Sequence, residues 1–123
     1  MLKLPAHHIS FKYAFEGWLY AFRTQPNFRI HTYGAIVAVT LGFLLGLTKT
    51  EWLILLLTIF LVFIVELINT SIEATSDLIT TSHNPVAKAA KDTAAGAVLM
   101  MALCAVVVGY FLFWEKLLRF FGF

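Results

Sequence analysis

The sequence predicts an all-α membrane protein in which a helix in the membrane interface precedes three membrane-spanning helices. Of its 123 residues, 60% are hydrophobic and 13% are charged, which is too apolar for a soluble domain of this size. The apolar residues form three long runs, and a helix of ~20 such residues crosses the hydrocarbon core of a bilayer. A net charge of +2 is too small to indicate a nucleic-acid partner. One domain covering residues 1–123 is expected.

The interfacial helix is expected over residues 9–24. Apolar and aromatic side chains cover most of its projected surface, while Lys12, Glu16 and Arg23 project within about 40° of one another. One charged stripe on an apolar helix is typical of a helix lying in the interface, although an ordinary amphipathic core helix would show a similar pattern. The segment 24–27 then predicts a turn, because Pro26 disfavours a helical conformation at Gln25.

The three spans are expected at about residues 28–47, 52–75 and 86–114. The connector at residues 48–51 is so short that the first two spans should form an antiparallel hairpin. The second connector is longer and polar, and it ends in Asn84 and Pro85, which suit the cap and the first position of a new helix. We expect the first turns of this helix to run along the membrane surface through Lys88, Lys91 and Asp92 before it enters the bilayer.

The positive charges predict the orientation of the chain. Six Lys or Arg residues fall on one expected side of the membrane and three on the other. The larger group contains Lys3, Lys12, Arg23, Arg29, Lys88 and Lys91. Cytoplasmic segments of membrane proteins carry an excess of Lys and Arg. The N-terminus and the acidic stripe described next are therefore expected to be cytoplasmic.

A stripe of polar residues ends the second span on that side. Glu66, Asn69, Glu73 and Asp77 share one face of a helix, and carboxylates at membrane depth are costly and usually functional. Glu66 lies about 10 Å deeper than Glu73 along the helix axis. The stripe thus places one carboxylate at the water side, where it can bind a divalent cation, and another at greater depth, where it can accept a proton.

Each of these residues also has a purely structural interpretation. Glu66 and Asn69 could form hydrogen bonds between helices, Asp77 could be a solvated residue at a helix end, and Lys91 with Asp92 could be a surface pair. The four histidines are expected to bind nothing: His7, His8 and His31 at the interface and His83 in a loop. The placement of the acids and the Lys-Asp pair on one side of the membrane favours the functional interpretation.

The motif Glu66-x-x-Asn69-Thr-Ser-x-Glu73-x-x-x-Asp77, followed by Ala-Lys-Asp and Ala-Ala-Gly-Ala-Val-Leu, resembles the signature of the prokaryotic diacylglycerol kinase family. This family includes the undecaprenol kinases of Gram-positive bacteria, and the resemblance covers nearly the whole chain. The segments 10–17 and 27–31 are more similar to the undecaprenol kinases. The resemblance implies a homotrimer in the bacterial plasma membrane, with sites between subunits that use MgATP to phosphorylate a lipid. Undecaprenol is the expected acceptor, and diacylglycerol is the alternative.

The resemblance also implies roles for individual residues. Glu66 is similar to the general base of the family, and Asn69 and Asp77 to polar residues that brace the site. Glu73 matches a magnesium ligand, but Gln25 stands where a second acidic ligand is usual and supplies an oxygen without charge. The residues implied for the nucleotide are Tyr13, Glu73, Ser82, Asn84, Lys91 and Asp92. Those implied for the lipid are Arg29, Glu66 and Ala95.

The sequence departs from the family in a second place and leaves other classes of function open. The loop before the third span reads Ser82-His83-Asn84 where the family often has Glu-Tyr-His, so the adenine contacts are not assigned. Intramembrane acids also mark ion and proton pathways. A small structural subunit with an inert polar seam would show the same apolar spans.

Overall fold

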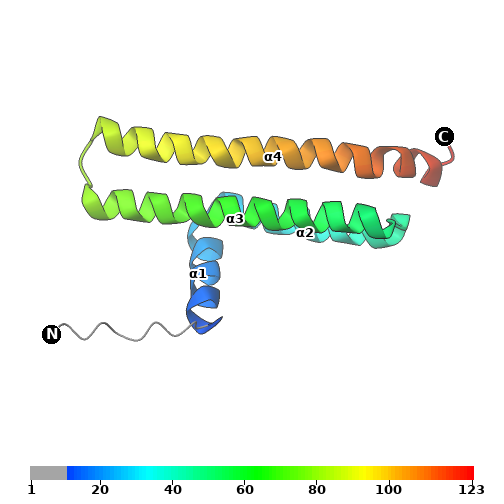
Figure 1. The fold of residues 1–123 in the computed structure, drawn as a ribbon, viewed down its shortest axis with the longest axis horizontal. Helices are drawn as coiled ribbons and strands as arrows, with labels where there is room; N and C mark the ends of the chain where they lie inside the picture. The colour runs from blue at the N-terminus through cyan, green and yellow to red at the C-terminus, as the bar shows by residue number, and fades with distance from the viewer. Residues whose placement is uncertain (1–10) are drawn as a thin grey trace.

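The computed structural model describes residues 11–123, which form four helices and no strand. These are α1 (Phe11–Thr24), α2 (Pro26–Leu45), α3 (Lys49–Ile79) and α4 (Pro85–Phe120) (Figure 1). The last three are long and apolar enough to cross a membrane, so the predicted class of fold is confirmed. The expected start of the first helix at residues 9 and 10, and also Lys3, His7 and His8, lie outside the described residues.

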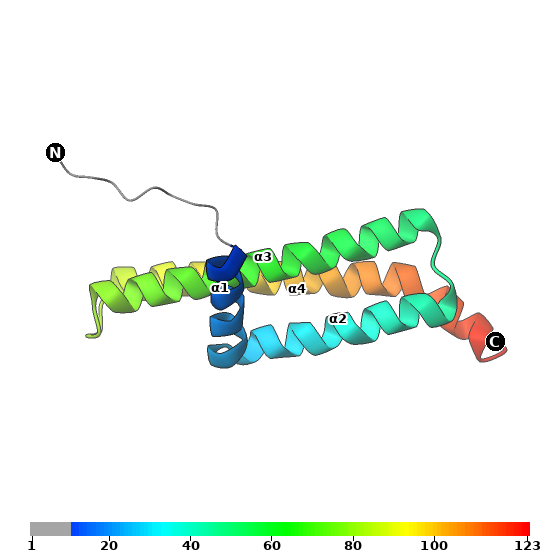
Figure 2. The ribbon, with the colours of Figure 1, turned by 90° about the horizontal axis from the view of Figure 1, so that it is seen from below.

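The three long helices lie along one another, while α1 crosses them. Figure 1 shows α3 and α4 side by side, and Figure 2 shows α2 running back along α3 from the short connector. In both views α1 is nearly perpendicular to α3 at a level where α2 begins. A helix perpendicular to the spans has the direction expected for one that lies in the plane of the interface. The Ile79 end of α3 and the Pro85 end of α4 extend past this level.

Local signals fix the hairpin between α2 and α3. Gly46 follows α2 with a φ of 66°, a left-handed conformation that favours glycine. Thr48 then caps α3: its hydroxyl accepts a hydrogen bond from the Glu51 N–H at 3.3 Å, and its own N–H donates to Glu51 Oε2 at 2.7 Å. This reciprocal pair satisfies two free donors at the start of the helix. The predicted antiparallel hairpin is present.

The start of α4 agrees with the prediction. Asn84 Oδ1 accepts hydrogen bonds from Val86 N at 2.9 Å and Ala87 N at 3.1 Å, as expected of a cap. From Pro85 onward α4 is one continuous helix, and the expected run of its first turns along the membrane surface stays a prediction. These turns follow the end of α3, to which Lys91 is joined by an ion pair with Asp77. The long extension of α3 gives these turns a surface to pack on.

An aromatic cluster joins α1, α2 and α3. The Trp18 ring lies 4.9 Å from the rings of both Phe28 and Phe63, and Phe28 and Ala21 are fully buried. A second cluster joins α2, α3 and α4 near the opposite ends of the helices and consists of Leu47, Leu55, Leu112 and Phe113. Phe63 is less than one helical turn from Glu66. The aromatic cluster therefore holds the turn between α1 and α2 next to the acidic stripe of α3.

Candidate active site

The deeper residues of the acidic stripe form a buried polar face on α3 that faces the corner between α1 and α2. Glu66 is 1% exposed, and Asn69 and Thr70 are also buried. The Thr70 hydroxyl donates to the Glu66 carbonyl at 2.8 Å, and Asn69 Nδ2 donates to Glu73 Oε1 at 3.1 Å. Helical spacing alone brings these residues together. The structure therefore unites Glu66, Asn69 and Glu73 on one side of α3.

The turn between α1 and α2 reaches this face through Gln25. Its Nε2 donates to Glu73 Oε2 at 3.0 Å, a contact that spans 48 residues of sequence. Both oxygens of the Glu73 carboxylate thus accept an amide hydrogen, one from Gln25 and one from Asn69. The sequence-predicted metal position and the Gln25 turn meet at this carboxylate.

The residues around Glu73 fit a magnesium ion that takes most of its ligands from a nucleotide. In residues 11–123, no cluster of three or more His, Cys, Asp or Glu residues could hold a metal by itself. The buried Asn69 Oδ1 has no hydrogen-bond partner, and the amides of Asn69 and Gln25 can each present an oxygen instead of a nitrogen. One carboxylate with neutral oxygens suits Mg²⁺, which keeps several waters and binds phosphate oxygens.

His31 is a member of the site that sequence reasoning missed. Its Nε2 lies 3.2 Å from Glu66 Oε1, whereas the sequence predicted a histidine at the interface with no partner. Glu66 Oε1 has no well-aligned hydrogen bond in the described part of the chain, so the contact is one of charge and proximity. The two residues are far apart in sequence, and only the crossing of α2 over α3 brings them together. No periodicity within either helix could have indicated this pair.

Two ion pairs lie on the extended ends of α3 and α4. Lys91 contacts Asp77, and Lys88 contacts Asp92. These side chains are more exposed than the Glu66 face, with 62% of the Asp77 side chain accessible. Within residues 11–123, neither Lys91 nor Asp92 forms an ion pair or hydrogen bond with Glu73. Lys91 and Asp92 therefore sit at the more exposed end of the stripe.

The remaining residues predicted for the nucleotide lie on α1 and in the connector between α3 and α4. Tyr13 lines a groove of about 480 Å³ between α1 and α3, and the α3 wall of this groove includes Ser71 and Ala74. Tyr13 itself is 70% exposed. In the connector to α4, the Ser82 hydroxyl lies 3.0 Å from that of Thr80, and the Asn84 oxygen caps α4. The structure thus places Tyr13 on α1 and the other two in the connector.

The two other residues predicted for the lipid, besides Glu66, are in different settings. Arg29 Nη1 donates to the carbonyl oxygens of Phe22 and Arg23, both at 3.0 Å, and so caps the end of α1. Ala95 is exposed on α4 beside the buried Ala94. Arg29 therefore shapes the corner that carries Gln25, and the structure assigns no contact of either residue to Glu66.

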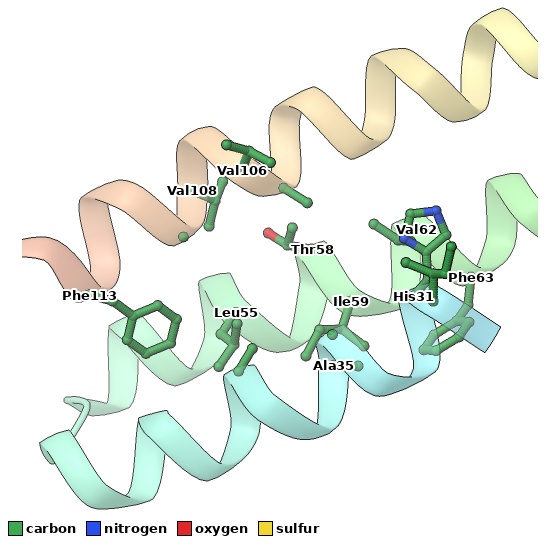
Figure 3. Close-up of a pocket in the computed structure, with 15 residues that line it drawn as sticks. His31, Ala35, Leu55, Thr58, Ile59, Val62, Phe63, Val106, Val108 and Phe113 are labelled. Carbon is green, nitrogen blue, oxygen red and sulfur yellow. The ribbon is translucent and has the colours of Figure 1, made fainter. Parts of the chain in front are cut away.

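An apolar cavity of about 270 Å³ lies between α2, α3 and α4. Figure 3 shows His31 at one end and Phe113 at the other. Small residues account for the space: an added Cβ at Gly34 of α2 or Gly109 of α4, both of which line the cavity, would meet no atom within 4 Å. Among the residues of 11–123 that line it, His31 is the only ionisable one. The cavity therefore adjoins the ring that contacts Glu66.

Comparison with known proteins places the chain among lipid kinases. The profile of the family described as prokaryotic diacylglycerol kinase matches residues 12–113. An undecaprenol kinase of Bacillus subtilis is 45% identical over 88% of both chains. A diacylglycerol kinase of Synechocystis is 49% identical, and the match covers 82% of this chain but 58% of the relative's length. A diacylglycerol kinase of Haemophilus influenzae is 35% identical, and the match covers 79% of this chain and 81% of the relative.

These findings agree with the predicted class, a bacterial membrane enzyme of the lipid kinase type. The three apolar helices and the match over most of the chain lead to the same conclusion. The chain belongs to the prokaryotic diacylglycerol kinase family.

Proposed function

We propose that this protein transfers the terminal phosphate of MgATP to the primary hydroxyl of a membrane lipid, with undecaprenol as the acceptor. The observation that carries the proposal is the arrangement of two carboxylates on α3. Glu66 lies below Glu73 and is 1% exposed, and Glu73 accepts hydrogen bonds from the side-chain amides of Gln25 and Asn69. We further propose that the working enzyme is a homotrimer with its N-terminus and its active site on the cytoplasmic side of the plasma membrane.

The two carboxylates divide the work. Glu66 accepts the proton of the lipid hydroxyl while the hydroxyl oxygen attacks the terminal phosphorus of ATP; the bond between this phosphorus and the β-phosphate oxygen breaks, and ADP leaves. Glu73 would hold the magnesium ion, and the amides of Asn69 and Gln25 would each offer it an oxygen. When bound, Mg²⁺ neutralises charge on the phosphate oxygens and fixes their position, which is most of what phosphoryl transfer requires.

The exposed end of the stripe binds the nucleotide. Lys91 supplies a positive charge for phosphate, and Asp77 holds the Lys91 side chain through their ion pair. Asp92 lies one helical turn from Lys88 and binds the sugar side of the nucleotide. Tyr13 contacts the nucleotide from α1, and Ser82 and Asn84 contact it from the connector. In this arrangement the nucleotide enters from water while the lipid reaches Glu66 from the bilayer.

Two observations support undecaprenol as the acceptor. The match to an undecaprenol kinase extends over 88% of both chains, and the apolar cavity beside His31 can take part of a long hydrocarbon chain. Arg29 and Ala95 are assigned to the lipid with Glu66. Diacylglycerol remains the second candidate, because relatives that match most of this chain carry that name.

A competition assay tests the choice of lipid. Equal amounts of undecaprenol and diacylglycerol are placed in the same vesicles with the purified protein and MgATP, and both phosphorylated products are quantified by mass spectrometry. We expect undecaprenyl phosphate to predominate. Predominance of phosphatidic acid would establish the alternative acceptor and contradict the choice proposed here.

The variant Glu66→Gln separates the kinase from the other classes of function. A kinase that depends on this carboxylate loses ATP-dependent product while its assembly remains intact. An ion or proton pathway would instead change ion flux in vesicles without ATP. A structural subunit would lose stability and would have no catalytic rate in the unchanged protein.

A further inference from the structure

We propose that His31 is a positioning residue that holds the Glu66 carboxylate in the orientation needed to accept a proton. The inference rests on the proposed kinase function. Its basis is the 3.2 Å separation between His31 Nε2 and Glu66 Oε1, which joins two helices through their side chains.

The surroundings of Glu66 leave His31 as its electrostatic partner. On α2, the other charged residue is Arg29, whose guanidinium is engaged with carbonyl oxygens at the end of α1. On α3 the nearest acid along the face is Glu73, which would oppose a second negative charge. On α4 the segment 93–114 contains no charged residue, and the side chains buried there, such as Ala94 and Val98, are apolar. The charged side chains of α1 are exposed at its surface.

A buried carboxylate needs a polar neighbour to offset the loss of water. The imidazole of His31, with its Nε2 3.2 Å from one carboxylate oxygen, is such a neighbour. Glu66 Oε1 has no aligned hydrogen bond in the described residues, so the contact acts through charge and proximity. His31 therefore restrains the orientation of the carboxylate.

The position of His31 at the cavity adds a second reason. Its ring is partly exposed, with 21% of the side chain accessible, and it borders the apolar cavity between α2 and α4 (Figure 3). A lipid whose chain enters this cavity would bring its hydroxyl past the ring to the carboxylate. His31 thus stands between the apolar space and the proton acceptor.

The test compares three substitutions on α2 in the full-length protein. His31→Leu removes the polar ring at similar bulk, His31→Gln keeps a polar group with an N–H, and Tyr33→Phe alters a residue of the same helix that is 59% exposed. We expect His31→Leu to lower kcat by about 10- to 100-fold, the effect of losing one polar contact to a charged group, with KM for ATP unchanged. His31→Gln should recover most of kcat, and Tyr33→Phe should match the unchanged protein.

A double variant and the unchanged protein complete the design. In a Glu66→Gln background, His31→Leu should cause no further loss, because both changes disable the same base. Full activity of His31→Leu would overturn the inference, as would an equal loss in His31→Gln or an additive loss in the double variant. Absence of lipid phosphorylation by the unchanged protein would instead refute the proposed function. The two failures are therefore distinguishable.

Discussion

The contact between Gln25 and Glu73 predicts that Gln25→Glu will create a stronger magnesium site. Gln25 Nε2 lies 3.0 Å from Glu73 Oε2, so the substitution replaces an amide donor with a carboxylate oxygen at nearly the same place. Two carboxylates then face each other across the position proposed for the metal. Divalent cations bind such pairs because each carboxylate contributes both an oxygen ligand and a negative charge.

The size of the effect follows from the separation. Two like charges 4 Å apart repel by about 4 kcal/mol at an effective dielectric constant of 20. Rotation of the two partly exposed side chains and solvent screening reduce this, and we expect about 1–2 kcal/mol of lost stability without metal. A bound Mg²⁺ removes the repulsion, so the same free energy reappears as affinity. The magnesium concentration for half-maximal activity should fall about tenfold, since ~1.4 kcal/mol corresponds to a factor of ten.

Two readouts and one control make the test specific. Kinase activity is measured against free Mg²⁺ at saturating ATP, and the unfolding temperature in detergent is measured with Mg²⁺ alone. Asn27→Asp adds the same charge near the start of α2, where a negative charge interacts favourably with the helix dipole, but its side chain has no contact with Glu73 in the structure. An unchanged magnesium dependence of Gln25→Glu, or an equal shift in Asn27→Asp, would refute the reasoning.

Three further substitutions, two of which have a matched control variant, test other parts of the structure. Lys91→Met breaks the exposed ion pair with Asp77; it should raise KM for ATP about tenfold and leave the unfolding temperature nearly unchanged, since such pairs contribute about 0–1 kcal/mol. Phe28→Ala removes a fully buried ring and should cost about 3–5 kcal/mol in the free energy of unfolding, whereas Phe28→Leu should recover most of it. Gly42→Ala places a Cβ 2.8 Å from Trp52 Cη2 and should cost about 1–3 kcal/mol, while Gly34→Ala, with no atom within 4 Å, should be neutral. A loss of stability in Lys91→Met as large as that in Phe28→Ala would contradict these assignments.

The sequence predicted those parts of the site that depend on one helix. The hydrogen bond from Asn69 to Glu73 follows from a spacing of four residues on α3, and the Asn84 cap follows from its position before Pro85. Both are set by neighbours in the chain, so the helical period and local chemistry are sufficient to predict them.

The contacts between helices could not be predicted in the same way. The pairing of His31 with Glu66 depends on the angle and height at which α2 crosses α3, and these are fixed by the aromatic packing of Phe28 against Phe63. The contact between the first turns of α4 and the end of α3 could not be predicted for a related reason. The charges of these turns indicated only a segment at the membrane surface, whereas the long end of α3 provides a partner surface beyond the level of α1.

The most direct test of the central claim follows the terminal phosphate of ATP in a single turnover. Labelled ATP is mixed with the purified protein in vesicles that contain undecaprenol, and the label in the lipid is counted for the unchanged protein and for Glu66→Gln. We predict that the unchanged protein transfers the label to the lipid and that Glu66→Gln transfers at least about 100-fold less, as expected for loss of a general base. Transfer at an equal rate by Glu66→Gln, or no transfer by the unchanged protein to undecaprenol or diacylglycerol, would contradict the account.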